Sequence, residues 1–253
     1  MRIVVKVGTS TLAHGTGMLN VRRVERLTRV ISDLKNAGHE IILVSSGAIG
    51  MGAGKLNLSG RPSDIPTKQA AAAVGQCELM YIYDKLFGEY HHNVAQMLLT
   101  ADDFADGLRH DNLSNTLARL LQLGALPIIN ENDTVATAEL GIGDNDTLSA
   151  LVAVSSGADL LVILSDIDGL YTADPHTDSS AELIREVNNA DDVAGFAGGT
   201  VSGLGTGGMA TKIAAAKLVN GHGMDMIICS GADPDLLYDI CEGKPVGTRF
   251  RGA

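Results

Sequence analysis

A glycine-rich stretch in the last quarter of the chain, VSGLGTGGMATK, ends in Lys212 and leads into a helical pattern. A Walker loop is excluded, because that motif has glycine directly before its lysine and Thr211 stands there. The spacing of Gly203, Gly205 and Gly208 fits a dinucleotide-binding fingerprint, but no strand precedes it and no acidic residue follows about 20 positions later. Bare backbone N–H groups at the start of a helix still favour an anion. Two interpretations therefore stay open, a phosphate-holding loop and a flexible surface loop.

A second lysine, Lys6, lies within RIVVKV, an almost continuous apolar run that is typical of a strand buried on both faces. A charge there is costly unless something binds it; the alternative is a structural lysine at a sheet edge. Gly8 and Thr9 follow this strand, and Ser46 and Gly47 follow a second one, EIILVS. Both turns offer unhindered backbone donors, so they predict phosphate or carboxylate oxygens between them.

Three acidic residues could complete such a site. Asp144 and Asp146 flank Asn145 in GDNDTLSA, and Asp133 lies in NENDT. The alternative for the first group is helix capping by Asn145 or Asp146. Carboxylates near two lysines could instead orient them, assist a magnesium ion or receive an ammonium group. No HRD-like pattern for a general base is present, and a carboxylate acceptor would need none, because with a pKa of about 4.3 it is ionised at neutral pH.

The elements that must position these residues alternate between strand-like and helix-like runs along the whole chain. This alternation predicts one α/β domain over residues 1–253, a three-layer sandwich with a mainly parallel sheet. The predicted strands are 2–7, 40–45, 93–99, 126–129, 160–165 and 224–229. The predicted helices are 21–38, 66–90, 113–123, 148–156, one after Met209 and one from Pro234, with a glycine-rich turn after residue 45 and an irregular region at 170–205. Asn20 is a plausible cap of the first helix and Gly38 its stop.

Polar or glycine-rich turns follow five of these strands: GTST, SSGAIGMG, NENDTVAT, SDIDGLYTADP and SGADP. In an open parallel sheet they share the carboxyl edge, where such folds bind ligands. We expect Lys6 and Lys212 to approach one charge there from opposite sides. That arrangement favours phosphoryl transfer, which needs positioning and cations rather than covalent help.

Composition narrows the class of protein. The formal net charge is −11 and no basic cluster stands out, which disfavours nucleic-acid binding. No apolar run approaches the roughly 18 residues of a membrane span, and the N-terminus lacks the pattern of a secretory signal, so we expect a cytoplasmic protein that binds no membrane. Three widely spaced cysteines, Cys77, Cys229 and Cys241, are expected to be reduced core thiols.

The motifs together resemble the glutamate 5-kinases of the amino acid kinase family. The resemblance runs from Lys6 to the closing GTRF and is carried by KVGTST, VSSGAIGMG, TKQAAAAVGQ, QMLLT, INENDTVAT, GDNDTLSALVA, SDIDGLYTADP and VSGLGTGGMATK. KVGTST and DIDGLY indicate only the wider family, whereas INENDTVAT, GDNDTLSA and SGLGTGGMATK are more specific. Many members continue into a C-terminal PUA domain, and this chain ends at Ala253, so a short form with one kinase domain is expected.

The resemblance implies transfer of the γ-phosphoryl group of MgATP to the side-chain carboxylate of L-glutamate, the first step toward proline. It implies that Lys6 and Lys212 stabilise the transferring group and that Asp146 orients these lysines. The nucleotide side is implied to comprise Lys6, Gly8, Thr9, Ser165, Asp166, Thr206, Gly207, Gly208, Met209, Ala210, Thr211 and Lys212. The glutamate side is implied to comprise Ser46, Gly47, Asp133, Asp144 and Asn145, and no residue is implied as a direct metal ligand. Feedback inhibition by L-proline and a homo-oligomer are further expectations from the family.

Two other functions stay open at this point. One is a kinase of the same fold that acts on aspartate, N-acetylglutamate or UMP, although a free ammonium group favours acidic partners such as Asp133. The other is a catalytically silent nucleotide-binding sensor, which would keep the glycines but could lose the lysines.

Overall fold

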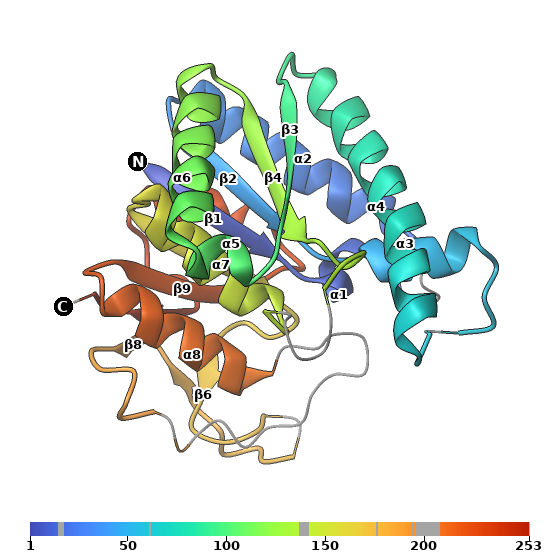
Figure 1. Ribbon diagram of the computed structural model, residues 1–253. Coiled ribbons are helices and arrows are strands. Elements are labelled where there is room, and N and C mark those ends of the chain that lie inside the picture. Colours follow the sequence, from blue (N-terminus) through green and yellow to red (C-terminus); the bar gives the residue numbers. More distant parts are fainter. Residues whose placement is uncertain are drawn as a thin grey trace.

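The computed structural model describes residues 1–14, 18–60, 62–136, 142–175, 177–193, 195 and 208–252. Its centre is a sheet in which the described strands have the order β3-β4-β2-β1-β5-β9-β10-β8 (Figure 1). The strands are β1 (Arg2–Val7), β2 (Glu40–Ser45), β3 (Val94–Leu99), β4 (Leu126–Glu131), β5 (Leu160–Ser165), β8 (Glu186–Val187), β9 (Asp225–Ser230) and β10 (Thr248–Phe250). β10 pairs with β9 antiparallel, and the other pairs are parallel. A separate antiparallel pair joins β6 (Leu170–Tyr171) and β7 (Leu183–Ile184).

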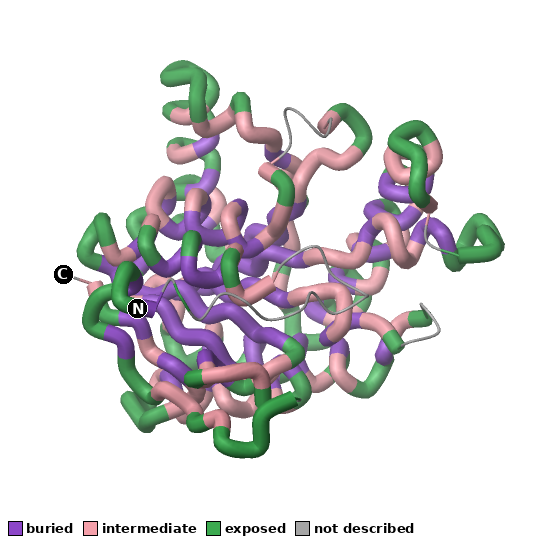
Figure 2. The backbone as a smooth tube through the Cα atoms, turned by 90° about the horizontal axis from the view of Figure 1, so that it is seen from below, coloured by how far each residue is buried: buried purple, intermediate pink, exposed green. Residues whose placement is uncertain are grey.

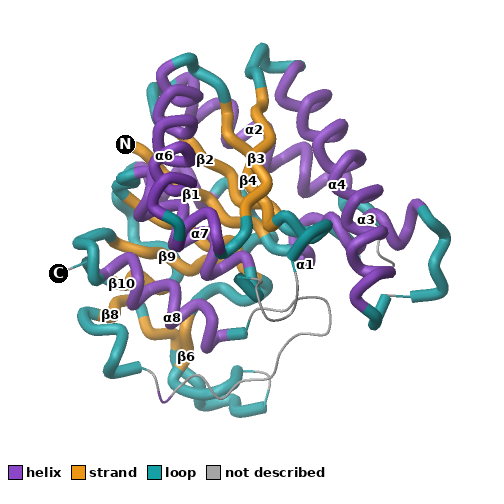
Figure 3. The backbone as a smooth tube through the Cα atoms, in the orientation of Figure 1, coloured by secondary structure: helices purple, strands orange, loops and turns teal. Residues whose placement is uncertain are grey.

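Helices cover both faces of this sheet, which confirms the predicted three-layer α/β sandwich (Figure 3). One face carries α6 (Gly107–Gln122), α7 (Asn145–Ser156) and α8 (Met209–Asn220). The opposite face carries α2 (Val21–Asn36), α4 (Ile65–Gly88) and α9 (Leu236–Cys241). Three further helices of the described residues, α1 (Thr9–Leu12), α3 (Ala48–Lys55) and α5 (Asp102–Ala105), follow strands or turns. No helix among the described residues is long and apolar enough to cross a membrane.

The core consists of two apolar layers, one on each side of the sheet. Figure 2 shows the buried strands in the middle of the molecule and the exposed segments at its outside. Alternate residues of a strand point to opposite faces: Val4 packs in the layer under α7, whereas Val5 packs in the layer under α2. Lys6 follows the period of Val4, so its side chain points toward α7. β1 lies between β2 and β5, and therefore Lys6 is in the middle of the sheet rather than at an edge.

Local sequence signals account for several helix ends. Asn20 caps α2 by accepting a hydrogen bond from Arg23 N at 3.2 Å, and Gly38 follows that helix with φ +93°, as predicted. Asp64 caps α4 through Thr67 N at 2.9 Å, and Asp106 caps α6 through Arg109 N at 2.9 Å. With the cap at Asp106, α6 begins at residue 107, six residues before the predicted start.

The glycine-rich segment after β2 is a correction to the sequence prediction. Only Ser46 and Gly47 form the turn, and the following residues form α3. A Cβ atom on Gly52 would lie 1.7 Å from Ala71 O, and one on Gly75 would lie 1.8 Å from Ala48 O. These two glycines therefore serve the close contact of α3 with α4, visible in Figure 1, rather than a turn.

The cysteine prediction is correct in part. Cys229 is buried in the core, but Cys77 is exposed on α4 and Cys241 is partly exposed at the end of α9. The prediction for Cys77 relied on apolar neighbours in the sequence. On a helix, however, Cys77 points in a different direction from Gly75 and Gln76, which face the interior, so its side chain is exposed.

Candidate active site

The carboxyl ends of five strands lie at one level of the sheet. Register pairs Val7 of β1 with Ser45 of β2 and with Leu164 of β5. Ser165 pairs in turn with Ser230 of β9, and β4 continues to Glu131 beside β2. The turns that follow these strands therefore meet at one edge, as parallel strands require.

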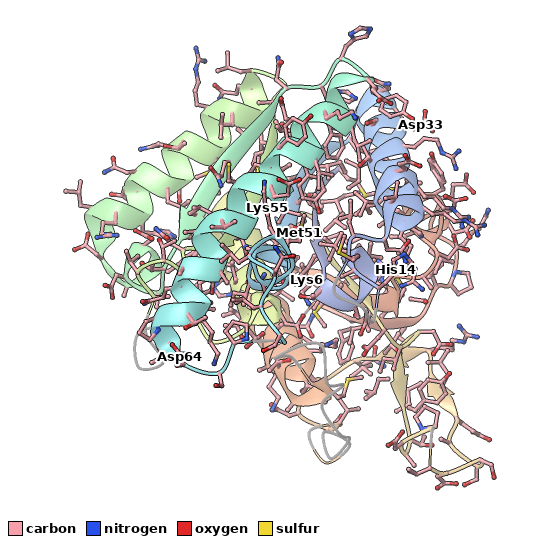
Figure 4. All side chains as sticks on the ribbon, turned by 90° about the vertical axis from the view of Figure 1, so that its right-hand side faces the viewer. Lys6, His14, Asp33, Met51, Lys55 and Asp64 are labelled. Atoms are coloured by element: carbon pink, nitrogen blue, oxygen red, sulfur yellow. The ribbon has the colours of Figure 1, made fainter. Side chains whose placement is uncertain are left out.

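A buried carboxylate joins the two lysines that the sequence singled out. Asp146 lies in the first turn of α7, and its Oδ1 atom is 2.7 Å from Lys6 Nζ. Its Oδ2 atom accepts a hydrogen bond from Lys212 Nζ at 3.1 Å and lies 2.8 Å from Thr211 Oγ1. Lys6 comes from β1 and Lys212 from α8, so Asp146 links the sheet to both helix starts. Figure 4 shows Lys6 near the centre of the molecule, whereas Asp33 and Asp64 lie toward its outside.

The charges of this cluster do not balance. Asp146 is fully buried, and Lys6 and Lys212 are 8% and 5% exposed. Burial raises the pKa of the Asp146 carboxyl, but the ammonium groups of Lys6 and Lys212 outweigh this effect and hold its pKa below the ordinary value. Two cations and one anion leave a net charge of +1. Because a buried net charge is costly, the cluster is suited to an additional anion.

Backbone donors lie beside the lysines. Gly208 caps α8 in an extended conformation and, as a glycine, offers no side chain to the first N–H groups of this helix. Gly8 lies between β1 and α1, and a Cβ atom there would be 3.6 Å from Lys6 Nζ. These groups, with Thr9 after Gly8 and with Met209 and Ala210 in the first turn of α8, can bind an anion. The predicted residues Thr206 and Gly207 lie outside the described residues.

The structure also brings together three residues predicted on the acceptor side. Asn145 Nδ2 donates to Ser46 Oγ at 2.8 Å and to Ser45 O at 3.2 Å. Gly47 follows Ser46 with φ +106°, a conformation that favours glycine, and caps α3. A hydroxyl, an amide and the start of a helix thus face one region beside the lysine cluster.

The two remaining acidic residues predicted on the acceptor side lie in separate places: Asp144 at the start of α7 and Asp133 in the turn after β4. Asp144 is the cap of α7 and accepts from Thr147 N and from Thr147 Oγ1, both at 2.9 Å. The structure therefore corrects the alternative that Asn145 or Asp146 caps this helix. Asp133 follows β4, and burial, followed by the charge of Glu131, raises its pKa to about 6.

Ser165 and Asp166 lie on the other side of β1. Ser165 ends β5 and donates to Asp166 Oδ1 at 3.0 Å, and Ser165 O accepts from Gly231 N at 2.7 Å. The register of β5 against β1 places Ser165 opposite Gly8. The two predicted groups of site residues therefore lie on opposite sides of the lysine cluster.

Three polar residues in the same region were not predicted. Asn130 is 3% exposed; its Oδ1 atom accepts from Asn145 Nδ2 at 3.0 Å, and its Nδ2 atom donates to Gln76 Oε1 at 2.9 Å. Glu131 accepts from Ile142 N at 2.7 Å, and burial raises its pKa. Asn130 and Glu131 immediately precede the predicted Asp133 turn, and Gln76 is a polar residue in an alanine-rich helical stretch; these were the available signals.

The described residues do not offer a set of protein ligands for a metal ion. They contain no group of three or more His, Cys, Asp or Glu side chains placed to hold one. Both oxygens of Asp146, the central carboxylate, contact lysine ammonium groups instead.

Comparisons with known proteins identify the family. The amino acid kinase family model matches residues 1–230. Glutamate 5-kinase of Clostridium perfringens is 51% identical over 254 residues, covering 98% of this chain and 94% of that protein. Glutamate 5-kinase of Caldanaerobacter subterraneus is 53% identical over 251 residues, covering 99% of this chain and 68% of that protein.

Solved structures agree on the fold. UMP kinase from Bacillus anthracis superposes with a TM-score of 0.68 at 17% identity, over 99% of this chain and 96% of that one. Carbamate kinase from Giardia lamblia bound to AMP-PNP gives a TM-score of 0.70 at 17% identity, over 99% and 98% of the two chains. The chain belongs to the amino acid kinase family and, within it, to the glutamate 5-kinases.

Proposed function

We propose that the protein transfers the γ-phosphoryl group of ATP to the side-chain carboxylate of L-glutamate, forming L-glutamyl 5-phosphate for proline biosynthesis. The observation that carries this proposal is the buried Lys6–Asp146–Lys212 cluster with its net positive charge at the carboxyl edge of the sheet. The relatives that match nearly the whole chain at about 50% identity are glutamate 5-kinases, which supports the choice of acceptor.

The lysines and the carboxylate of the cluster have separate roles in the transfer. The ionised acceptor carboxylate attacks the γ-phosphorus, and the bond to the bridging oxygen of ADP breaks. Lys6 and Lys212 stabilise the charge on the transferring group, because preorganised cations in a water-poor site strengthen this interaction. Asp146 holds both ammonium groups in place; it is not a base, because its pKa is depressed and its oxygens are engaged.

The two sides of the cluster take the two substrates. Gly8, Thr9 and the first turn of α8 bind phosphate oxygens through backbone N–H groups, and Ser165 and Asp166 belong to the nucleotide side with them. Thr206 and Gly207 are proposed nucleotide contacts on the resemblance alone. Ser46, Gly47 and Asn145 position glutamate, and Asp133 and Asp144 supply negative charge for its ammonium group.

Magnesium is proposed to arrive with the nucleotide. Mg²⁺ commonly keeps several waters and binds substrate phosphates with few protein ligands, which fits a site whose described residues offer no cluster of ligands.

The function is tested by measuring ADP release from MgATP with L-glutamate, L-aspartate, N-acetylglutamate or UMP, with hydroxylamine added to trap an acyl phosphate. We expect ADP only with glutamate, together with an equal amount of hydroxamate. Release with another acceptor would overturn the acceptor assignment but leave the phosphate side intact. Release with none would indicate a nucleotide sensor.

Two further properties, inhibition by L-proline and oligomer formation, are also proposed from the family resemblance. L-Proline is expected to compete with glutamate, and the protein is expected to form a homo-oligomer. Inhibition by proline that is relieved by excess glutamate, and a molar mass in solution that is a multiple of 26.3 kDa, are the expected results.

Glutamate affinity is predicted to depend on the ionisation of Asp133, whose pKa is about 6. An ionised Asp133 attracts the ammonium group of glutamate, so the KM for glutamate should rise as the pH falls through about 6. Folding stability should have the opposite pH dependence from glutamate affinity. Because the pKa of Asp133 is raised in the folded protein, its protonated form stabilises the free protein, and this stability is lost as the pH rises through about 6. Kinetics between about pH 5 and pH 8, and thermal unfolding between about pH 4 and pH 7, would measure the two trends.

Asp133→Asn is the matched variant for this prediction. It should raise the KM for glutamate at pH 7.5 and flatten the pH dependence, with little change in the KM for ATP. A variant that changes only the KM for ATP would instead place Asp133 on the nucleotide side.

A further inference from the structure

We infer that Gln76, on α4, is a positioning residue for the acceptor carboxylate and acts through Asn130 and Asn145. This inference rests on the proposed function. Gln76 Oε1 accepts from Asn130 Nδ2 at 2.9 Å, and Asn130 Oδ1 accepts from Asn145 Nδ2 at 3.0 Å. Asn145 Nδ2 in turn lies 2.8 Å from Ser46 Oγ. An amide relay, defined here as Gln76, Asn130 and Asn145, thus connects a helix outside the site to the acceptor side.

Backbone groups fix the orientation of the relay. The N–H group of Glu131 can only donate, and it donates to Asn130 Oδ1 at 2.9 Å. Asn130 must therefore present its Nδ2 atom to Gln76, which in turn must present its Oε1 atom. The carbonyl of Ser45 can only accept, so the nearby atom of Asn145 is Nδ2 rather than Oδ1. The two protons of Nδ2 serve three acceptors, of which Ser45 O is the most distant, at 3.2 Å. Each amide has one orientation that satisfies its neighbours.

This orientation determines what Ser46 can offer to a substrate. Ser46 Oγ accepts a hydrogen bond from Asn145, so the proton of its hydroxyl remains to be donated. A carboxylate oxygen is an acceptor without a proton, and it matches this donor. Through Asn145, the relay therefore fixes the Ser46 hydroxyl as a donor, as a carboxylate substrate requires.

The position of Gln76 is set by the contact of two helices. Gly75, its neighbour, lies so close to α3 that a Cβ atom would be 1.8 Å from Ala48 O. Ala48 is the first residue of α3 and follows Ser46 and Gly47 directly. The same helix contact thus holds both ends of the path, the Gln76 side chain and the Ser46 turn.

The hydrogen bonding of Gln76 identifies which of its side-chain atoms matters. Its side chain is buried, at 7% exposure, and its Nε2 atom has no hydrogen-bond partner within the described part of the chain. A buried N–H group without a partner destabilises the folded protein. An apolar residue of the same size would only move this cost to Asn130, whose buried Nδ2 atom would lose its acceptor, so the useful atom of Gln76 is the Oε1 atom that contacts Asn130.

The test replaces Gln76 by methionine, which has a similar shape but no hydrogen-bonding amide. The KM for glutamate is expected to rise about tenfold, with the KM for ATP within about twofold of the wild-type value. The denaturant midpoint should change little, because the unpaired N–H group of Gln76 is exchanged for an unpaired N–H group of Asn130. Tyr83→Phe is the control on the same helix: it removes a buried hydrogen bond to Ser45 Oγ, 2.8 Å long, outside the relay. It should lower stability without raising the KM for glutamate.

Two further measurements distinguish positioning from general damage. In Gln76→Glu, burial favours the neutral acid, which keeps a carbonyl oxygen for Asn130, so the KM for glutamate should stay closer to the wild-type value than in Gln76→Met. In a cycle with Asn130→Ala, the effects of Gln76→Met and Asn130→Ala on the KM for glutamate should not add, because both act through one path.

The outcomes separate this inference from the proposed function. If the wild-type protein releases no ADP with glutamate, the proposed function and this inference both fall. If it does so and Gln76→Met leaves the KM for glutamate unchanged, only the inference on Gln76 is overturned. Equal losses in the Met and Glu variants, or additive effects in the cycle, would also overturn it. If Gln76→Met does not fold, the pH dependence of Gln76→Glu decides. The relay predicts that its KM for glutamate rises relative to the wild-type value as the introduced acid ionises at higher pH, and a KM that follows the wild-type pH profile would overturn the inference.

Discussion

Lys212→Ala should lower kcat for glutamate-dependent ADP release by about 10²-fold or more, the loss expected when one preorganised transition-state donor is removed. Lys212 Nζ lies in a buried cluster in which two ammonium groups share Asp146. Its removal leaves the Lys6–Asp146 pair, 2.7 Å long, with balanced charges. The fold should therefore persist, and the loss should fall on kcat rather than on stability. Steady-state kinetics with both substrates varied, together with thermal unfolding, would measure the two effects.

Lys217→Ala is the matched control for Lys212→Ala. Lys217 lies on the same helix, α8, and also forms an ion pair, with Asp191. Its side chain is 40% exposed, however, against 7% for that of Lys212, and exposed ion pairs contribute little to folding stability. Its replacement should leave kcat nearly unchanged. Near-normal turnover in Lys212→Ala would remove the role proposed for this lysine.

The sequence predicts the fold well because strand and helix runs have clear periodicity. The almost continuous apolar runs of β1, β2 and β5 identify strands that helices cover on both faces, and the structure has these strands in the centre of the sheet. The predicted irregular region after β5 contains only the two-residue strands β6, β7 and β8 among its described residues. β10 escaped prediction because it has three residues, and its pairing with β9 is antiparallel.

Glycine-rich segments were harder to interpret. In the segment after β2, Gly47 has a positive φ and forms the turn, whereas Gly52 allows a helix contact. Local sequence cannot distinguish these two uses, because the second depends on Ala71, a residue of another helix. The same limit explains why the start of α3 was taken for a turn.

The candidate site was predictable where a residue stands out from its own local sequence. Lys6 was conspicuous because a charge interrupts an apolar strand, and the structure brings it against Asp146. Asn130 and Gln76 were not, because their importance depends on a hydrogen bond between a strand and a helix 54 residues apart in sequence. Such long-range pairs leave no periodic signal in a single sequence.

Asp146→Asn should reduce both activity and stability, because Asp146 is the counter-charge of two buried lysines. Removing one member of a buried ion pair costs about 3–5 kcal/mol, since the remaining charge is left uncompensated. Here two ammonium groups would remain with a neutral amide. We also expect kcat to fall by about 10²-fold, because neither lysine would be held in position for the transferring group. Denaturant unfolding and steady-state kinetics of the same preparation would test both effects.

The pH dependence of this variant gives a sharper test. In the wild-type protein the depressed pKa of Asp146 contributes stability above its ordinary value of 3.8, and this contribution is lost as the pH falls through the lower folded-state pKa. In Asp146→Asn the amide does not titrate, so this acid-side loss should be absent. The difference in stability between the wild-type protein and the variant should therefore shrink as the pH falls through the folded-state pKa of Asp146.

Asp235→Asn is the control for the change of a carboxylate to an amide. Asp235 forms an ion pair with Arg26 at 2.6 Å, shorter than the contact of Asp146 with Lys212, but both side chains are more than one-third exposed. Water replaces the lost partner there, so this variant should have nearly wild-type stability and kcat. If Asp146→Asn were equally mild, the two lysines would not depend on this carboxylate, and its proposed role in holding them would be wrong.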